Sequence, residues 1–252
     1  MLKLPVLYYH HICEPPDGTR SPSVYMETHR FAAQLRLLRR LGYQSISLDE
    51  FCDCVETGRQ PVGRRVLITF DDGHEDNYIN ALPLLKEYGF TATIFVAAGL
   101  IGKRFRFNHT VDPQGDPLMT EKQIRDWLQQ GMEIQSHGLN HGNLAQMPED
   151  EVRRELTESR TILENVTGKP IRYFCYPFGS FRPSTLTLVE AAGYRAAFST
   201  IRGKTHSWDE RFCFCRIPVH HESSLFKVWQ HLWIKSYARS KKRQHALMDS
   251  RP

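Results

Sequence analysis

Residues 66–73 read Val-Leu-Ile-Thr-Phe-Asp-Asp-Gly, a β-branched, apolar run that ends in two carboxylates and a glycine. Such a run predicts a buried strand followed by a tight turn. Adjacent carboxylates at the end of a buried strand repel each other unless a cation or a proton relieves the repulsion. Asp71 and Asp72 are therefore either part of an ordinary Asp-Gly turn or one side of a site that holds a cation.

Strand and helix patterns alternate on both sides of this stretch. Strands are expected at residues 5–9, 43–48, 91–97, 133–135, 173–176, 196–199 and 212–219. Helices, each closed by a glycine, are expected at residues 31–41, 48–55, 78–88, 123–130, 149–167 and 184–192. This alternation predicts an α/β fold in which parallel strands, joined by right-handed helical crossovers, close into a barrel. In such folds the chemistry lies at the C-terminal ends of the strands.

The composition is ordinary for a globular domain: 252 residues, 40% of them hydrophobic and 24% charged. These values exclude a disordered or fibrous protein. The longest apolar runs, such as residues 92–100, are too short to span a bilayer. The apolar run at the N-terminus is short, contains Pro5 and lacks a small-residue cleavage site, so we expect the chain to stay in the cytoplasm.

Six cysteines occur as two Cys-x-Cys pairs, at 52 and 54 and at 213 and 215, and as single residues at 13 and 175. None of these spacings matches a structural zinc site. The favoured interpretation is reduced, partly buried thiols. The alternative is that Cys213 and Cys215, on one face of a strand, bind a second metal or pair with another cysteine.

We expect residues 1–225 to form the folded domain and residues 226–252 to add a basic, aromatic helix and tail. Trp229, Trp233 and Tyr237 recur every four residues and so share one helical face. Basic residues follow at Lys235, Arg239, Lys241, Lys242, Arg243 and Arg251. The favoured interpretation is a helix packed on the domain with a solvated tail. The alternative is peripheral contact with an anionic membrane at its cytoplasmic face. No nucleic-acid-binding motif is visible, so nucleic acid is not an expected partner.

A second chemical motif reads Ser136-His137-Gly-Leu-Asn-His141. Histidines four residues apart can share one side of a helical turn and reach the same metal, although such pairs also occur by chance. With Asp72 they would form a site of two histidines and one aspartate with an open position for water, which is typical of a catalytic metal. Asp71 would then be left to take a proton from that water.

These motifs resemble those of the polysaccharide deacetylases of carbohydrate esterase family 4, the NodB-like domain. Residues 69–73 resemble the first family motif and residues 136–141 the second, while residues 176–179, Tyr-Pro-Phe-Gly, resemble the third. Residues 6–12, Val-Leu-Tyr-Tyr-His-His-Ile, look like the opening strand of one branch. The resemblance runs from about residue 5 to about residue 219. It implies a single-domain, deformed (β/α) barrel of about seven parallel strands.

The resemblance also implies roles for individual residues. Asp71 is the implied catalytic base, and Asp72, His137 and His141 are the implied ligands of one divalent metal ion. Zinc is expected, with cobalt, nickel or manganese as alternatives. Phe178 matches the aromatic residue whose backbone N–H stabilises the oxyanion, a function that does not depend on the side chain.

The other implied residues are less closely matched. His220 and His221 are candidates for the histidine acid of the fifth motif, and the alternative is a surface pair. His10, Tyr176 and Pro177 are expected to bind substrate.

The chain also departs from the family pattern. Cys175 stands where many members have an arginine that holds the base, so Arg172 or another cation takes that role or the brace is absent. The fourth motif is not visible beyond Trp208-Asp209.

The implied activity is metal-dependent removal of an N-acetyl group from an amino sugar. The expected substrate is an N-acetylated carbohydrate, either a glycan or a lipid-linked or nucleotide-linked sugar. Two alternatives remain: an esterase that acts on O-acetyl groups of carbohydrate, and a non-catalytic carbohydrate-binding relative.

Overall fold

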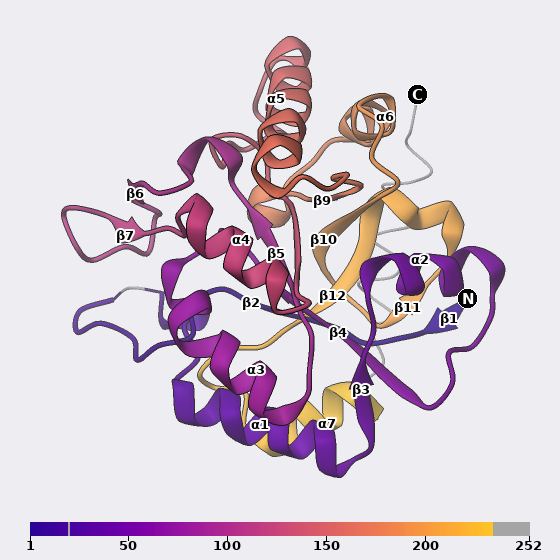
Figure 1. Ribbon diagram of the computed structural model, residues 1–252. Coiled ribbons are helices and arrows are strands. Elements are labelled where there is room, and N and C mark those ends of the chain that lie inside the picture. Colours follow the sequence, from indigo (N-terminus) through magenta and orange to yellow (C-terminus); the bar gives the residue numbers. More distant parts are fainter. Residues whose placement is uncertain (20, 234–252) are drawn as a thin grey trace.

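Seven parallel strands form a closed barrel in the computed structural model, which describes residues 1–19 and 21–233 (Figure 1). Around the ring the strands are β2 (Val6–Tyr9), β12 (Phe214–Pro218), β10 (Ala196–Arg202), β9 (Tyr173–Cys175), β8 (Glu133–Ser136), β5 (Thr93–Val96) and β4 (Arg64–Phe70). The ring closes because β4 pairs with β2 as well as with β5. The predicted barrel of about seven strands is therefore confirmed. An eighth strand, β3 (Tyr43–Ser45), pairs with β4 outside the ring.

Helices surround this barrel (Figure 1). They are α1 (Thr28–Arg40), α2 (Leu48–Thr57), α3 (Leu82–Tyr88), α4 (Glu121–Gln129), α5 (Glu149–Thr167), α6 (Pro183–Ala191) and α7 (Leu225–Trp233). Short helical turns are η1 (Pro22–Val24), η2 (Asn77–Ala81), η3 (Ala98–Leu100), η4 (Pro177–Gly179) and η5 (Trp208–Cys213). Two small antiparallel pairs, β1 (Leu2–Lys3) with β11 (Thr205–His206) and β6 (Arg104–Phe105) with β7 (Asp116–Pro117), had no sequence signal.

Local sequence signals explain where the helices begin and end. Ser47 caps α2, since its hydroxyl accepts a hydrogen bond of 3.1 Å from the backbone N–H of Glu50. Gly58 ends the same helix in the left-handed conformation, at φ 70°. Gly168, at φ 64°, ends α5 in the same way. These signals are local in sequence, and the predicted helices therefore lie close to the observed ones.

Alternate strand residues face opposite sides of the barrel wall. In β4, Leu67 belongs to a core cluster inside the barrel, whereas Ile68 belongs to the cluster between the barrel and the surrounding helices. Phe51 of α2 joins the inner cluster, with its ring 5.8 Å from that of Phe198 and 5.3 Å from that of Phe214. Helix α2 therefore covers the end of the barrel where the strands begin and leaves the opposite end open.

The last barrel strand begins later than predicted. Residues 212 and 213 belong to η5, and β12 starts at Phe214. Cys213 and Cys215 therefore do not lie on one strand face, and both are buried in the outer core cluster. None of the six cysteines, all of which lie in the described residues, forms a disulfide.

Helix α7 packs beside α1 (Figure 1). Its Val228 and Leu232 are buried in the outer core cluster, and the half-buried Trp229 stacks on Phe226 at 5.7 Å. This packing is what the favoured interpretation of residues 226–252 expects. Tyr237 and the basic residues from 235 onward lie outside the described residues, so membrane contact through them stays a prediction. Within the described residues, no helix combines the length and the apolar character that a membrane crossing requires.

Candidate active site

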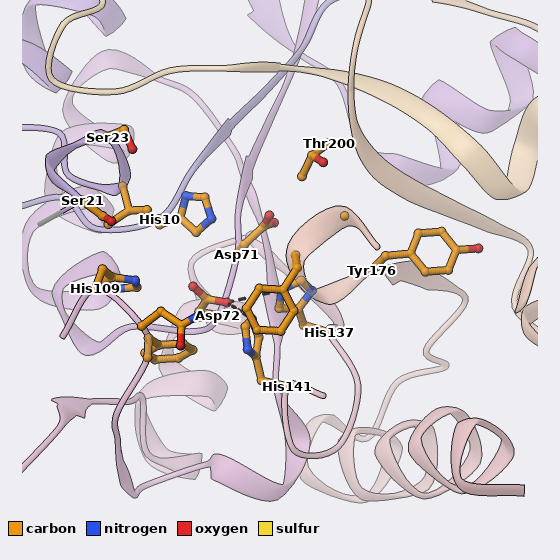
Figure 2. A pocket seen from close by; sticks show the side chains of 15 residues that line it. His10, Ser21, Ser23, Asp71, Asp72, His109, His137, His141, Tyr176 and Thr200 are labelled. Atoms are coloured by element: carbon orange, nitrogen blue, oxygen red, sulfur yellow. Dashed lines mark ion pairs between the residues drawn. The ribbon is translucent and has the colours of Figure 1, made fainter. Parts of the chain in front are cut away.

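A pocket lies at the C-terminal end of the barrel, lined by residues from several strand ends (Figure 2). His10 follows β2, Asp71 and Asp72 follow β4, and His137 follows β8. These residues are far apart in sequence, and parallel strands bring them together because their C-terminal ends share one rim.

Asp72, His137 and His141 converge in this pocket. The Oδ1 atom of Asp72 lies 3.3 Å from Nε2 of His137 and 3.0 Å from Nε2 of His141. All three side chains are buried, yet this Oδ1 atom has no aligned hydrogen-bond partner. The three atoms therefore point at a common position rather than at one another, which is the arrangement of ligands around a cation. Two imidazoles and one carboxylate are a donor set that suits zinc.

A hydrogen bond fixes the ring orientation of His137. Its Nδ1 atom lies 2.8 Å from the carbonyl oxygen of Cys175, and only an Nδ1–H can donate to that oxygen. The lone pair of the neutral ring is then on Nε2, which faces Asp72. This is the usual way in which a protein orients a metal-ligating histidine.

Backbone strain is concentrated at the pocket. Three non-glycine residues in the described part of the chain have positive φ: Asp72 at 75°, His141 at 56° and Phe178 at 58°. All three line the pocket. Such conformations are unfavourable outside glycine and persist only where surrounding contacts impose them.

Asp71, beside Asp72, is turned toward a different partner. Its two carboxylate oxygens each accept a hydrogen bond of 2.7 Å from Arg216, which is fully buried inside the barrel. Arg216 also donates to the carbonyl of Ser199 at 3.0 Å, and its guanidinium lies 4.3 Å from the ring centroid of Tyr8. Burial alone would raise the pKa of Asp71, but the charge and hydrogen bonds of Arg216 hold that pKa below its ordinary value. Asp71 is thus ionised and separate from the three converging atoms.

His10 lines the same pocket as the two carboxylates (Figure 2). Its backbone carbonyl accepts a hydrogen bond of 2.7 Å from the side chain of Asn77, which fixes the chain at this point. Burial lowers the pKa of His10, although the charges of Asp72 and Asp71 oppose that shift. A lower pKa makes its protonated form a stronger acid than an exposed histidine.

Comparison with known proteins identifies the family. A sequence profile described as polysaccharide deacetylase matches residues 58–197, more than half of the chain. The chain belongs to the polysaccharide deacetylase family. The Bacillus subtilis protein YxkH is 32% identical over 217 residues, which are 86% of this chain and 71% of YxkH.

Other family members are more distant. Poly-beta-1,6-N-acetyl-D-glucosamine N-deacetylases of Staphylococcus aureus are 28% identical over 179 residues, and the chain spans 59% of their length. The Streptococcus pyogenes deacetylase PplD, solved in complex with acetate, superposes with a TM-score of 0.80 at 25% identity, covering 92% of this chain and 98% of that one. IcaB from Ammonifex degensii shares the fold, with a TM-score of 0.79, 24% identity and coverage of 91% and 97%.

Asp71 is not paired with the arginine that the sequence had suggested. Arg172 precedes β9, at the opposite end of the barrel from Asp71, and its side chain lies 3.4 Å from Asp49. Arg172 therefore does not hold Asp71, and Arg216 holds this carboxylate instead. Cys175 contacts that pair, with its sulfur 3.0 Å from a guanidinium nitrogen of Arg216. Burial raises the pKa of Cys175, so this side chain is a neutral thiol.

Several predicted site residues do not reach the pocket. Neither His220 nor His221 is among its lining residues, and the N–H of His221 donates to the carbonyl of Tyr25 at 2.8 Å. Pro177 is buried but does not line the pocket. Tyr176 does line it, yet its ring points away and its hydroxyl donates to the carbonyl of Phe212 at 2.9 Å (Figure 2).

Glu155 supports the loop between His137 and His141 and was not predicted. This buried carboxylate accepts hydrogen bonds from the backbone N–H of Leu139 at 2.7 Å and of Asn140 at 3.1 Å, between the two histidines. Its signal in the sequence is a charge on the buried face of α5, beside Val152 and Leu156. A charged residue at such a position is normally paired.

The Asp71–Arg216 pair predicts how stability depends on pH. Arg216→Met should destabilise the metal-free chain by about 3–5 kcal/mol near neutral pH, because it leaves a buried carboxylate unpaired. In the wild type the lowered pKa of Asp71 adds stability above its unfolded pKa. In the variant the lowering by Arg216 is lost, and burial outweighs the smaller effects of His137 and His10 and raises that pKa, so ionisation opposes folding and the loss of stability shrinks as the pH falls. Urea unfolding at about pH 7 and about pH 5 measures both values.

The control for this experiment is the double variant Asp71→Asn/Arg216→Met, which removes both charges. Its stability relative to the wild type should depend less on pH than that of the single variant. An equal loss for Arg216→Met at both pH values would show that the two charges are not coupled.

Proposed function

We propose that this protein is a metal-dependent hydrolase that removes N-acetyl groups from an amino sugar within a carbohydrate. The observation that supports the proposal is that two adjacent carboxylates have different partners. Asp72 converges with His137 and His141, while Asp71 is ionised and paired with Arg216. A protein that only binds carbohydrate has no need of an ionised base held beside a cation site.

Asp72, His137 and His141 are the residues that would hold the cation. Zinc fits this ligand set best, and cobalt, nickel or manganese are the alternatives. Such a cation lowers the pKa of a water molecule and polarises the acetyl carbonyl.

The remaining steps belong to side chains and backbone of this chain. Asp71 accepts the proton of the attacking water, and Arg216 holds its carboxylate in one orientation. The backbone N–H of Phe178 is the proposed donor to the oxyanion, at a turn held in the left-handed region. His10, in its protonated form, is the proposed donor of a proton to the departing nitrogen, in the role that the sequence had suggested for His220 or His221.

The choice of an N-acetyl substrate is supported by the relatives. The Staphylococcus aureus proteins are named as N-deacetylases of poly-beta-1,6-N-acetyl-D-glucosamine, and 68% of this chain aligns with them. An ester is easier to hydrolyse than an amide, so the same site would also attack O-acetyl groups. Activity on N-acetylated amino sugars is therefore the observation that distinguishes an N-deacetylase from an O-acetyl esterase.

Acetate release tests the proposed function and its dependence on metal. The chain should release acetate from β-1,6-linked or β-1,4-linked N-acetylglucosamine oligomers, lose this activity after treatment with a chelator, and regain it with zinc or cobalt. Asp72→Ala should be inactive under all conditions, with an unchanged circular dichroism spectrum. Release from acetylxylan alone would favour the esterase, and no release from any substrate would contradict catalysis.

Substitution of histidines separates the proposed acid from the earlier candidates. His10→Ala should lower kcat by about 10²–10⁴-fold, because a proton donor acts on the chemical step, with KM changed little. His220→Ala and His221→Ala should keep the wild-type kcat, since neither residue lines the pocket. Steady-state kinetics on one oligomer, with metal content measured for each variant, gives the answer. A large loss in His220→Ala or His221→Ala, with His10→Ala unimpaired, would reverse the assignment.

A further inference from the structure

A second group of potential metal ligands lies beside the first. The Nε2 atoms of His11 and His109 are 3.1 Å apart, and each lies 3.7 Å from Oδ2 of Asp116. Their side chains are between 5% and 13% exposed. His11 follows β2, Asp116 begins β7, and His109 lies in the segment between β6 and β7. Three separate parts of the chain thus bring two imidazoles and a carboxylate to one point.

The spacing of these atoms matches that of ligands around one cation. Zinc–nitrogen bonds of about 2.0–2.1 Å in tetrahedral geometry place neighbouring ligand atoms about 3.3 Å apart. The atoms of Asp72, His137 and His141 lie 3.0 and 3.3 Å apart in the first site. The second group, at 3.1 and 3.7 Å, has nearly the same spacing and the same donor types.

A further carboxylate orients His11. Its Nδ1 atom lies 2.6 Å from Oδ2 of Asp76, and the other oxygen of Asp76 accepts a hydrogen bond of 2.8 Å from the backbone N–H of Ile12. Asp76 therefore fixes the ring with Nδ1–H toward itself and directs Nε2 at His109 and Asp116. A carboxylate behind the outer nitrogen of a histidine is the usual support of a metal ligand.

Aromatic rings hold the imidazoles in place. The ring of His11 stacks between Tyr25, at 4.5 Å, and His74, at 3.5 Å. The ring of His109 stacks on Phe107 at 5.3 Å with an interplanar angle of 10°. Rings that are stacked in this way cannot rotate freely, so the packing holds the Nε2 atoms of His11 and His109 close together.

His74 lies between the two groups and supplies an independent observation. It is fully buried, and its Nε2 atom lies 3.3 Å from Oδ2 of Asp72. Its Nδ1 atom is buried without a hydrogen-bond partner. One ring nitrogen of His74 lies within 4.8 Å of ligand nitrogens of His11 and His109. An unpartnered buried nitrogen is unfavourable unless something else satisfies it, and a nearby cation would do so.

We propose that His11, His109 and Asp116 bind a second divalent cation, with His74 between this second metal site and the first. A set of two imidazoles and one carboxylate takes zinc, or cobalt as its substitute. His109 lines the pocket, so a cation there adds positive charge at the pocket wall, where oxygen atoms of a bound carbohydrate can reach it. The proposal goes beyond the deacetylase reaction, and its test does not depend on activity.

Metal stoichiometry tests the second site. The full chain is stripped with a chelator, reconstituted with excess zinc chloride, desalted, and analysed by inductively coupled plasma mass spectrometry. The wild type should retain two zinc ions per chain, while His109→Ala, Asp116→Asn and Asp72→Ala should each retain one. Asp112→Asn is the matched control, because this residue lies in the same segment, is exposed and, within the described residues, forms an ion pair with Arg104 alone. It should retain two zinc ions, and circular dichroism checks the fold of each variant.

Two results would overturn the second metal site. Retention of one zinc ion by the wild type would do so without any variant, and would leave a direct N–H···N hydrogen bond between His11 and His109 as the explanation of their contact. A second zinc ion that survives in both His109→Ala and Asp116→Asn would mean that it binds elsewhere on the surface. Neither result bears on acetate release, so failure of this proposal is distinct from failure of the proposed function.

Discussion

The buried ion pair between Asp71 and Arg216 is the interaction on which the rest of the site depends. Two adjacent carboxylates in a buried position cannot both stay ionised without separate partners. The period of strand β4 turns Asp71 toward the barrel interior, where Arg216 neutralises it through two hydrogen bonds of 2.7 Å. The left-handed backbone at Asp72 turns the next carboxylate toward the two histidines. One short turn thus separates the proposed base from the proposed metal ligand.

Contacts around this turn keep the carboxylates of Asp71 and Asp72 directed at different partners. Glu155 binds the backbone between His137 and His141, and the carbonyl of Cys175 fixes the ring of His137. The sulfur of Cys175 lies 3.0 Å from the guanidinium of Arg216, on the side chain that holds Asp71. The positions of charge therefore follow from packing of the strand ends, and the three strained residues line the same pocket.

The sequence was sufficient for the barrel and for the grouping of Asp71 with Asp72, His137 and His141 in one pocket, because strand ends and glycine stops are local signals. It was insufficient for the partner of Asp71. Arg216 is 145 positions away, and no local pattern marks an arginine that faces a barrel interior. The sequence suggested Arg172 as the partner of Asp71 only because Arg172 is near the third motif, yet Arg172 lies at the other end of β9. The sequence also could not show which histidines line the pocket: His10 and His220 both follow barrel strands, and only the path of the chain beyond each strand places His10 in the lining and His220 outside it.

A crystal structure of the chain with zinc, with anomalous diffraction recorded at the zinc edge, tests the central claim most directly. The account predicts a zinc ion bonded to Asp72, His137 and His141 at about 2.0–2.2 Å, with Asp71 still paired to Arg216 and outside bonding distance. Direct coordination of the ion by Asp71, or an ion that Asp72 does not contact, would contradict it.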